Sequence, residues 1–265
     1  MRSLFFIPAN NHRYFEKAVN LDADLFIFDL EDSIHKDQIS SGIDNIRQHV
    51  DNFDDKAEKY IRIDRDLFKK CIDETADLDI DGYVIPKFEG VEEIQYIEKN
   101  LPDKKCIPLI ETVKGFFNMS DVLLKYRNRL AGLAFGAEDY CQDVGCLDKR
   151  ENLLSAKIRI IEMARYLKID AYDTIYPYIR DDEGFLNEAV FSSDLGFDGK
   201  MIIHPDQLSV LGKYNQEVQQ NLIEIVREYE KNLKDGRTVS VINGRIYERN
   251  HIKAIKNKLG ASVIN

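Results

Sequence analysis

The sequence predicts a parallel (β/α)8 barrel, and three observations lead to this fold class. Eight short apolar runs, rich in Ile, Val, Phe and Tyr, are spaced along the 265-residue chain. Helix-compatible stretches separate most of these runs, and strand–helix alternation repeated eight times is typical of such a barrel. The runs are continuously apolar rather than alternating, as expected for strands that are covered on both faces.

The predicted elements follow one another without an internal repeat, a low-complexity segment or a linker. In chain order, the expected strands cover residues 4–8, 25–30, 60–63, 83–86, 106–110, 130–136, 172–177 and 201–205. Expected helices include residues 12–21, 91–100, 119–126, 153–167, 183–195 and 215–233. We therefore expect one barrel domain over residues 1–213, a common size for this fold.

The tail, residues 214–265, departs from the barrel pattern after its first helical stretch. Asp235-Gly236-Arg237 is a turn signal, a β-like run covers residues 238–242, and Asn243-Gly244 favours a tight hairpin turn. A second short strand over 245–247 and a basic helix over 250–259 are expected to follow. We expect this short C-terminal extension to fold over the barrel rim or to pack on a neighbouring subunit.

Composition indicates which binding partners and which cellular compartment are expected for this protein. The formal net charge is −10, from 47 acidic and 37 basic residues, which disfavours binding to nucleic acid or to an anionic membrane. No apolar segment approaches the ~20 residues of a membrane span, and the N-terminal apolar run is too short for a signal peptide. The four cysteines, Cys71, Cys106, Cys141 and Cys146, form no CxxC pair, so a reduced cytoplasmic setting is expected.

Acidic residues follow two consecutive predicted strands. Glu111 comes directly after the run 106–110, and Glu138 and Asp139 come shortly after the run 130–136. If these strands are parallel, both ends lie at the same rim of the barrel, where the active sites of such barrels are found. Two carboxylates with water in the remaining positions suit Mg²⁺. The alternative is that they are unrelated surface acids at strand ends.

Active-site residues of such barrels lie at the ends of the strands, and a larger set of residues is expected at this rim. The largest group among them is acidic. So many carboxylates in one barrel mouth would repel each other unless a cation lies among them. This is a second argument for a metal ion. The collected residues are Pro8, Asp29, Glu31, Asp32, Arg62, Lys87, Glu111, Glu138, Asp139, Asp173, Tyr176 and His204.

Four of these residues have competing interpretations. Arg62, inside an apolar run, is either a structural salt bridge to a barrel acid or a two-pronged clamp on a substrate carboxylate. Lys87 is, in order of preference, an ion-pair partner, a phosphate or carboxylate contact, or a Schiff-base nucleophile. His204 is favoured as a core or rim histidine over a metal ligand. Asp173 is either a substrate contact or a hydrogen-bonded acid of the barrel floor.

Seven motifs, in order, resemble those of a known family. RSLFFIPAN, FDLEDSI, IPK, PLIETVKG, GLAFGAEDY, DTIYPYIRDDEG and LGFDGKMIIHPDQ resemble motifs of the citrate lyase beta-subunit-like family, within the HpcH/HpaI aldolase/citrate lyase superfamily. The resemblance runs from about Arg2 to about Gln207 and continues weakly through NGRIYERNH. It implies a barrel of the phosphoenolpyruvate/pyruvate type, which metal-dependent carbon–carbon lyases and aldolases share.

The resemblance also implies roles for individual residues. By the family pattern, Glu111 and Asp139 are the ligands of Mg²⁺, and Glu111 also contributes to substrate binding. Arg62 holds the oxo or hydroxy acid and takes part in catalysis, and Asp32 lies beside the metal waters as a catalytic base. Glu248 aligns with a tail aspartate that reaches toward a neighbouring active site, and the family suggests a homotrimer.

The activity implied by the resemblance is Mg²⁺-dependent carbon–carbon cleavage or formation. A 3-hydroxyacyl thioester of the citryl, malyl or citramalyl type would give a 2-oxo acid and an acyl thioester, carried by coenzyme A or an acyl carrier protein. Three further hypotheses stay open: a metal-dependent aldolase acting on free hydroxy-oxo acids, a Schiff-base aldolase using Lys87, and a non-catalytic subunit that binds an oxo acid.

Overall fold

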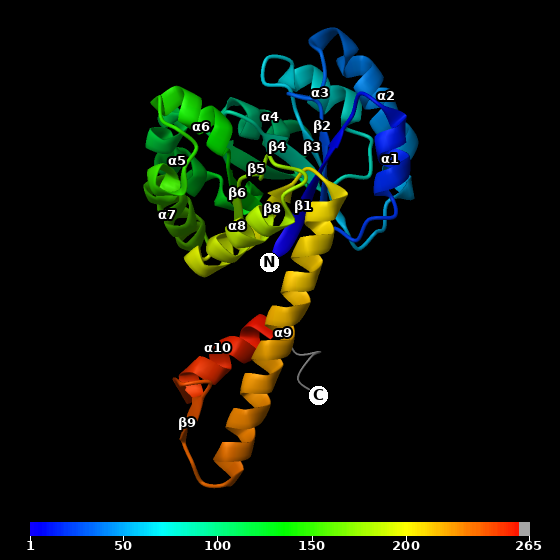
Figure 1. Cartoon of the computed structure of the whole chain (residues 1–265). Helices are drawn as coiled ribbons and strands as arrows, with labels where there is room; N and C mark the ends of the chain where they lie inside the picture. The colour runs from blue at the N-terminus through cyan, green and yellow to red at the C-terminus, as the bar shows by residue number, and fades with distance from the viewer. Residues whose placement is uncertain (260–265) are drawn as a thin grey trace. The chain divides into compact units, whose positions relative to one another are not determined.

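Eight parallel strands form a closed barrel in the computed structural model, which describes residues 1–259. Each strand pairs with the next along the chain, and β8 pairs with β1 (Figure 1). The predicted fold class is therefore confirmed. The strands are β1 (Arg2–Pro8), β2 (Leu25–Asp29), β3 (Glu58–Arg62), β4 (Gly82–Ile85), β5 (Lys105–Ile110), β6 (Gly132–Phe135), β7 (Asp170–Asp173) and β8 (Gly199–Ile202).

Helices surround the barrel on the outside, as Figure 1 shows. They cover the outer faces of the strands, which explains why the strands are apolar on both faces. The helices of this layer are α1 (His12–Ala18), α2 (Ile39–His49), α3 (Phe68–Thr75), α4 (Glu92–Asn100), α5 (Val113–Lys125), α6 (Ala137–Val144), α7 (Arg150–Leu167) and α8 (Asp182–Leu195).

The inside of the barrel is filled by side chains from alternate strand positions, so it is a packed core. Because side chains alternate between the two faces of a strand, residues two apart share a direction. This period decides which polar residues face the barrel mouth. The interior cluster contains Leu4, Leu25, Ile27, Tyr60, Val84, Ile107, Leu109, Ala134, Tyr172 and Met201.

Two element boundaries differ from the prediction, and both affect the site. Helix α5 begins at Val113 rather than at residue 119, because the Thr112 side chain accepts the Gly115 N–H at 3.0 Å and caps the helix. Strand β6 ends at Phe135, and α6 begins at Ala137. Asp139 therefore lies in the first turn of a helix, whereas the sequence pattern predicted a position at the end of a strand.

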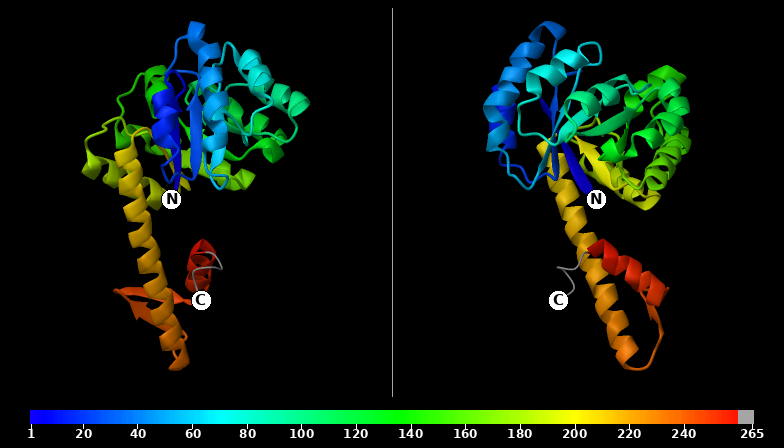
Figure 2. Two further views of the ribbon diagram at one scale, coloured as in Figure 1. Left: turned by 90° about the vertical axis from the view of Figure 1, so that its right-hand side faces the viewer. Right: turned by 180° about the vertical axis from the view of Figure 1, so that it is seen from behind.

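The chain divides into two compact units, of which the second begins at Ser209 and is described as far as Leu259. It contains most of α9 (Pro205–Lys234), the hairpin β9 (Val239–Ile242) and β10 (Arg245–Glu248), and α10 (Arg249–Leu259) (Figure 2). Its own core contains Ile225, Val226, Tyr229, Ile242, Tyr247 and Ile252. The expected division between residues 213 and 214 falls within α9 and stays a prediction, as does packing on a neighbouring subunit. Residues 260–265 of the predicted extension lie outside the described part.

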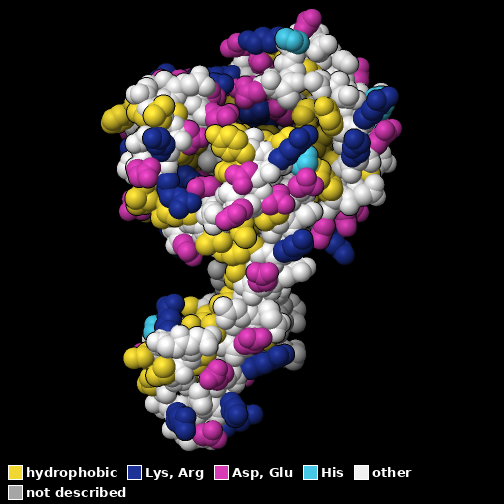
Figure 3. Space-filling model, viewed as in Figure 1, with side chains coloured by type: hydrophobic (Ala, Val, Ile, Leu, Met, Phe, Trp, Pro, Cys, Tyr) yellow, Lys and Arg dark blue, Asp and Glu magenta, His cyan; other side chains and the backbone are white. Residues whose placement is uncertain are grey.

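Charge is distributed without a dominant sign on the face of the molecule in Figure 3, where acidic and basic side chains are interspersed. Over residues 1–259, no helix combines the length and the apolar character needed to cross a membrane. The expected absence of nucleic-acid and membrane partners stays a prediction, as does the cytoplasmic setting.

Candidate active site

Strand periodicity places a group of charged residues at the mouth of the barrel. Asp29, Arg62 and Glu111 each lie two positions after a residue of the interior apolar cluster. Their side chains therefore point toward the barrel axis, at the ends where the parallel strands finish. Asp29 and Arg62 are also in-register neighbours on β2 and β3.

These residues line a cavity of about 470 Å³. It contains all four residues that the sequence predicted for the site, namely Asp32, Arg62, Glu111 and Asp139. The remaining lining residues are Phe6, Pro8, Asp29, Ser33, Leu109, Gly136, Ala137, Glu138, Gln142, Thr174, Ile175, Met201 and Ile203.

Glu111 is held in a defined position under the cavity. It is 4% exposed, and its Oε1 accepts the backbone N–H of Lys87 at 2.6 Å. Its Oε2 lies close to the Gly136 backbone, where a built Cβ would come within 2.2 Å of that oxygen. Gly136 thus provides the space that the Glu111 carboxylate occupies.

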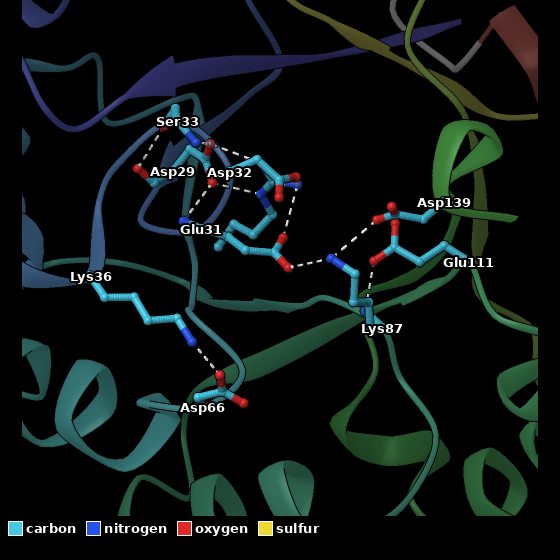
Figure 4. A network of polar contacts seen from close by, with 10 residues as sticks. Asp29, Glu31, Asp32, Ser33, Lys36, Asp66, Lys87, Glu111 and Asp139 are labelled. Carbon is cyan, nitrogen blue, oxygen red and sulfur yellow. Dashed lines mark hydrogen bonds and ion pairs between the residues drawn. The ribbon is translucent and has the colours of Figure 1, made fainter. Parts of the chain in front are cut away.

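The Glu111 carboxylate lies next to that of Asp139, which comes from the first turn of α6 (Figure 4). Burial, together with the nearby charges of Glu31 and Asp139, raises the pKa of Glu111 to about 8. The raised pKa means that negative charge is poorly compensated at this point. A bound cation would supply the missing compensation.

Lys87 connects three of the acids. Its Nζ lies 3.0 Å from Glu31 Oε1 and 3.1 Å from Asp139 Oδ2, and its N–H binds Glu111. Its backbone has a φ of +44°, a left-handed conformation that is uncommon outside glycine. Burial lowers the Lys87 pKa, but the Glu31 and Asp139 carboxylates outweigh burial and raise it. A charged, paired ammonium matches the preferred ion-pair interpretation, and it is a poor Schiff-base nucleophile.

The Arg62 guanidinium is already paired with more carboxylates of the protein than the clamp interpretation assumed. Its Nε and Nη2 bind the two oxygens of Asp29 at 2.6 and 2.8 Å, forming a bidentate pair. Its Nη1 lies 2.9 Å from Asp32 and 3.1 Å from Glu31. A substrate carboxylate would therefore meet the Nη1 edge, beside the exposed Asp32 carboxylate, and not the full two-pronged fork.

Glu31 was expected at the rim, but the sequence did not reveal the two ion pairs that it makes there. Its side chain is 9% exposed and lies between the guanidinium of Arg62 and the ammonium of Lys87. Burial raises the pKa of Glu31 to about 7, against the opposing effect of Arg62. Its position directly after the run 25–30 predicted a place at the rim, but one acidic residue among several gave no signal of this bridge.

Three further rim candidates, Asp173, Tyr176 and His204, do not line the cavity, and the Tyr176 hydroxyl donates to Asp181 instead. Asp173 follows the interior residue Tyr172, so it points outward, where Lys157 and Lys200 bind it at 3.0 Å and Ser192 donates to it. Despite complete burial, the two lysines lower its pKa to about 2. Asp173 is therefore a buried, hydrogen-bonded structural acid as the second interpretation expected, but it points away from the barrel interior and does not lie on the barrel floor. His204 lies 3.4 Å from Asp206 and lines a different cavity.

The donor set fits Mg²⁺. Glu111 and Asp139 are hard oxygen ligands, and Mg²⁺ sites commonly use one or two carboxylates and keep several waters. Within residues 1–259, no three His, Cys, Asp or Glu side chains form a group that could hold a metal ion. The protein would thus supply two ligands, and water and substrate oxygens would supply the others.

Gly136→Ala tests the space beside Glu111. The new methyl group would lie within 2.2 Å of Glu111 Oε2, so the carboxylate must move. We expect Mg²⁺ affinity, measured by calorimetry, to fall by about tenfold or more, because small changes in ligand position have effects of this size. Ala134→Gly, two residues earlier and within strand β6, is the control, and unchanged affinity in Gly136→Ala would contradict this geometry.

The raised pKa values of Glu31 and Glu111 predict how stability depends on pH. Both carboxyls keep protons in the metal-free folded state that the unfolded chain releases above about pH 4.5. The stability that these two protonated carboxyls contribute is therefore fully present below that pH and is lost as pH rises toward about 8. We expect the thermal midpoint of the metal-free protein to fall over this window, and to fall less in Glu111→Gln. Equal slopes in the two proteins would contradict the Glu111 assignment.

Comparison with known proteins finds a family model and relatives that match most of this chain. The model of a family described as HpcH/HpaI aldolase/citrate lyase matches residues 2–205. The (3S)-malyl-CoA thioesterase of Cereibacter sphaeroides is 27% identical, over 97% of this chain and 93% of its own length. Citrate lyase subunit beta of Leuconostoc mesenteroides subsp. cremoris is 28% identical, over 94% of this chain and 88% of its own.

A solved structure agrees with the sequence comparison. The citrate lyase beta subunit of M. tuberculosis, complexed with oxaloacetate and magnesium, has a TM-score of 0.69 and 25% identity. The match covers 80% of this chain and 95% of that one. Since the family model spans more than half of the residues, the chain belongs to the HpcH/HpaI aldolase/citrate lyase family.

Proposed function

We propose that this protein is a Mg²⁺-dependent lyase that cleaves a 3-hydroxyacyl thioester into a 2-oxo acid and an acyl thioester. The supporting observation is one cavity that contains the paired carboxylates of Glu111 and Asp139 together with Arg62 and Asp32. The oxaloacetate and magnesium bound by the M. tuberculosis structure support the same ligand chemistry. Citryl, malyl and citramalyl thioesters are the proposed substrates.

Mg²⁺ on Glu111 and Asp139 would act as a Lewis acid toward the hydroxyl and carboxylate oxygens of the substrate. Glu111 is fixed by the Lys87 N–H, so it needs little reorganisation on binding. Asp139 is paired with the Lys87 ammonium, which also holds Glu31. Lys87 therefore orients one proposed ligand through its backbone and the other through its side chain.

Arg62 would hold the substrate carboxylate through Nη1. Asp29 occupies the opposite edge of the guanidinium and fixes its plane. The positive charge would then lie beside the substrate hydroxyl, whose oxygen carries negative charge once its proton is lost. The exposed Asp32 carboxylate, which pairs with the same Nη1, would take the hydroxyl proton directly or through a water molecule.

Product analysis tests this function. The metal-free protein is incubated with malyl-, citramalyl- and citryl-CoA, with and without Mg²⁺, and the products are identified by mass spectrometry. The proposal predicts equal amounts of a 2-oxo acid and a shorter acyl-CoA, only with Mg²⁺, and none from Glu111→Gln. Failure to cleave any of the three, with Mg²⁺ present, would contradict it.

Thioester hydrolysis is a second candidate, favoured by the similarity to a (3S)-malyl-CoA thioesterase over nearly the whole chain. The same assay distinguishes the two, since hydrolysis gives free coenzyme A and a hydroxy acid with the carbon chain intact. Carbon–carbon cleavage leaves coenzyme A esterified. We prefer the lyase because Asp32, the proposed base, contacts Arg62 and lines the same cavity as the two proposed metal ligands.

The aldolase, Schiff-base and non-catalytic hypotheses each predict a different result. An aldolase acting on free acids would turn over pyruvate with aldehydes and would not cleave the acyl-CoA compounds. A Schiff-base enzyme would be trapped by borohydride at Lys87, and the ion pairs of that side chain argue against it. A non-catalytic subunit would bind oxo acids stoichiometrically without turnover. The carrier and the trimeric assembly remain proposals drawn from the family.

A further inference from the structure

Two cysteines that are five residues apart in sequence meet at the end of α6. The Sγ atoms of Cys141 and Cys146 lie 3.6 Å apart. Gly145, with a φ of +76°, ends the helix, and the Cys146 N–H donates to the Cys141 carbonyl at 3.0 Å. This left-handed cap turns the chain back so that the second thiol faces the first.

We propose that Cys141 and Cys146 are a thiol pair that closes to a disulfide in the presence of a peroxide, and that closure acts on the helix that carries Asp139. The sulfurs need only approach from 3.6 Å to about 2.05 Å. Side-chain rotation with a small shift of the cap can supply this movement. The remaining two cysteines, Cys71 and Cys106, are completely buried, so they offer no competing site.

The chemistry balances with one equivalent of hydrogen peroxide. The Cys146 thiolate, from the more exposed of the two residues, attacks one peroxide oxygen. The O–O bond breaks, giving a sulfenic acid on Cys146 and one water. Cys141 sulfur then attacks the Cys146 sulfur, the S–S bond forms, and the second oxygen leaves as water. Two thiols lose two electrons and two protons, and the peroxide is reduced to two waters.

Because the two cysteines lie at the end of α6, a disulfide between them is expected to affect the proposed metal ligands. Helix α6 carries Asp139 in its first turn, and in its last turn the Asp143 carboxylate accepts the Val113 N–H at 2.6 Å. Val113 begins α5, two residues after Glu111. A shift of the end of α6 therefore acts on both proposed metal ligands. This consequence depends on the proposed Mg²⁺ site, whereas formation of the disulfide does not.

The experiment treats the reduced full chain with stoichiometric hydrogen peroxide and maps thiols by alkylation and peptide mass spectrometry. We expect a Cys141–Cys146 disulfide within one chain, reversed by dithiothreitol, in the wild type and in Cys71→Ser. In Cys146→Ser no such disulfide forms. Alkylatable Cys141 and Cys146 after oxidation elsewhere in the chain, or a disulfide joining two chains, would overturn the pair.

Calorimetry with Mg²⁺ alone tests the second half of the proposal. Reduced protein that binds Mg²⁺ supports the metal site, independently of the thiols. We expect the oxidised protein to bind it about tenfold more weakly, the effect typical of disturbed ligand support, and the peroxide-treated Cys146→Ser to bind normally. Equal affinity of the reduced and oxidised wild type would overturn the link to α6. Absence of binding by the reduced protein would instead overturn the metal site.

Discussion

Glu111→Gln is expected to abolish lyase activity while leaving the protein folded. Glutamine keeps the size and one oxygen of the side chain, so it can still accept the Lys87 N–H, but it removes the negative charge. Loss of one of two protein ligands is expected to lower kcat/KM at least about 100-fold. The measurement is steady-state cleavage of the best thioester substrate at saturating Mg²⁺.

The matched control is Glu138→Gln, next to Asp139 on α6. Glu138 also lines the cavity, but no role is assigned to it. We expect its kcat/KM to stay within a few-fold of the wild type. A measurement of stability separates loss of chemistry from loss of fold. Glu111 largely keeps its proton in the metal-free protein near neutral pH, so Glu111→Gln replaces one neutral group by another and should not unfold it. An active Glu111→Gln enzyme would exclude Glu111 as a ligand.

Arg62→Met should be the most destabilising of the site substitutions. It leaves Asp29, whose side chain is 5% exposed, without its bidentate partner. Breaking a buried ion pair from one side costs about 3–5 kcal/mol of unfolding free energy. Activity should fall as well, because the substrate carboxylate loses its cationic partner. Urea unfolding and steady-state kinetics measure the two effects.

The double variant Asp29→Asn/Arg62→Met separates these two roles of Arg62. Removing the orphaned charge should restore much of the stability, since a neutral pair does not leave a buried ion uncompensated. Activity should not return, because nothing replaces the guanidinium at the cavity wall. If the double variant regained both stability and activity, Arg62 would have a structural role alone.

The barrel could be predicted from the sequence because strands that are buried on both faces consist of continuously apolar runs. It also located Glu111 and Arg62, since each stands at a fixed step from interior residues that the apolar runs reveal. Asp139 was expected at the end of a strand, and this prediction was wrong because Asp139 lies in the first turn of helix α6. A single glycine, Gly136, separates β6 from α6, and a run that reads as apolar to its end does not show where the strand stops.

The remaining features depend on contacts between distant segments. The bridge from Glu31 through Lys87 to Asp139 joins the loops after β2 and β4 to the first turn of α6, and its distances follow from barrel closure. Similarly, the left-handed backbone of Lys87 is imposed by its surroundings, because lysine has no intrinsic preference for it. The approach of Cys141 to Cys146 depends on the cap at Gly145, which residue spacing alone did not suggest.

The most direct test of the metal site is calorimetric titration of Mg²⁺ into the reduced, metal-free protein in buffers of different ionisation enthalpy. We expect one ion per chain, with proton release near neutral pH because the pKa of Glu111 is about 8, and no measurable binding in Glu111→Gln or Asp139→Asn. Unchanged Mg²⁺ affinity in both variants would contradict it.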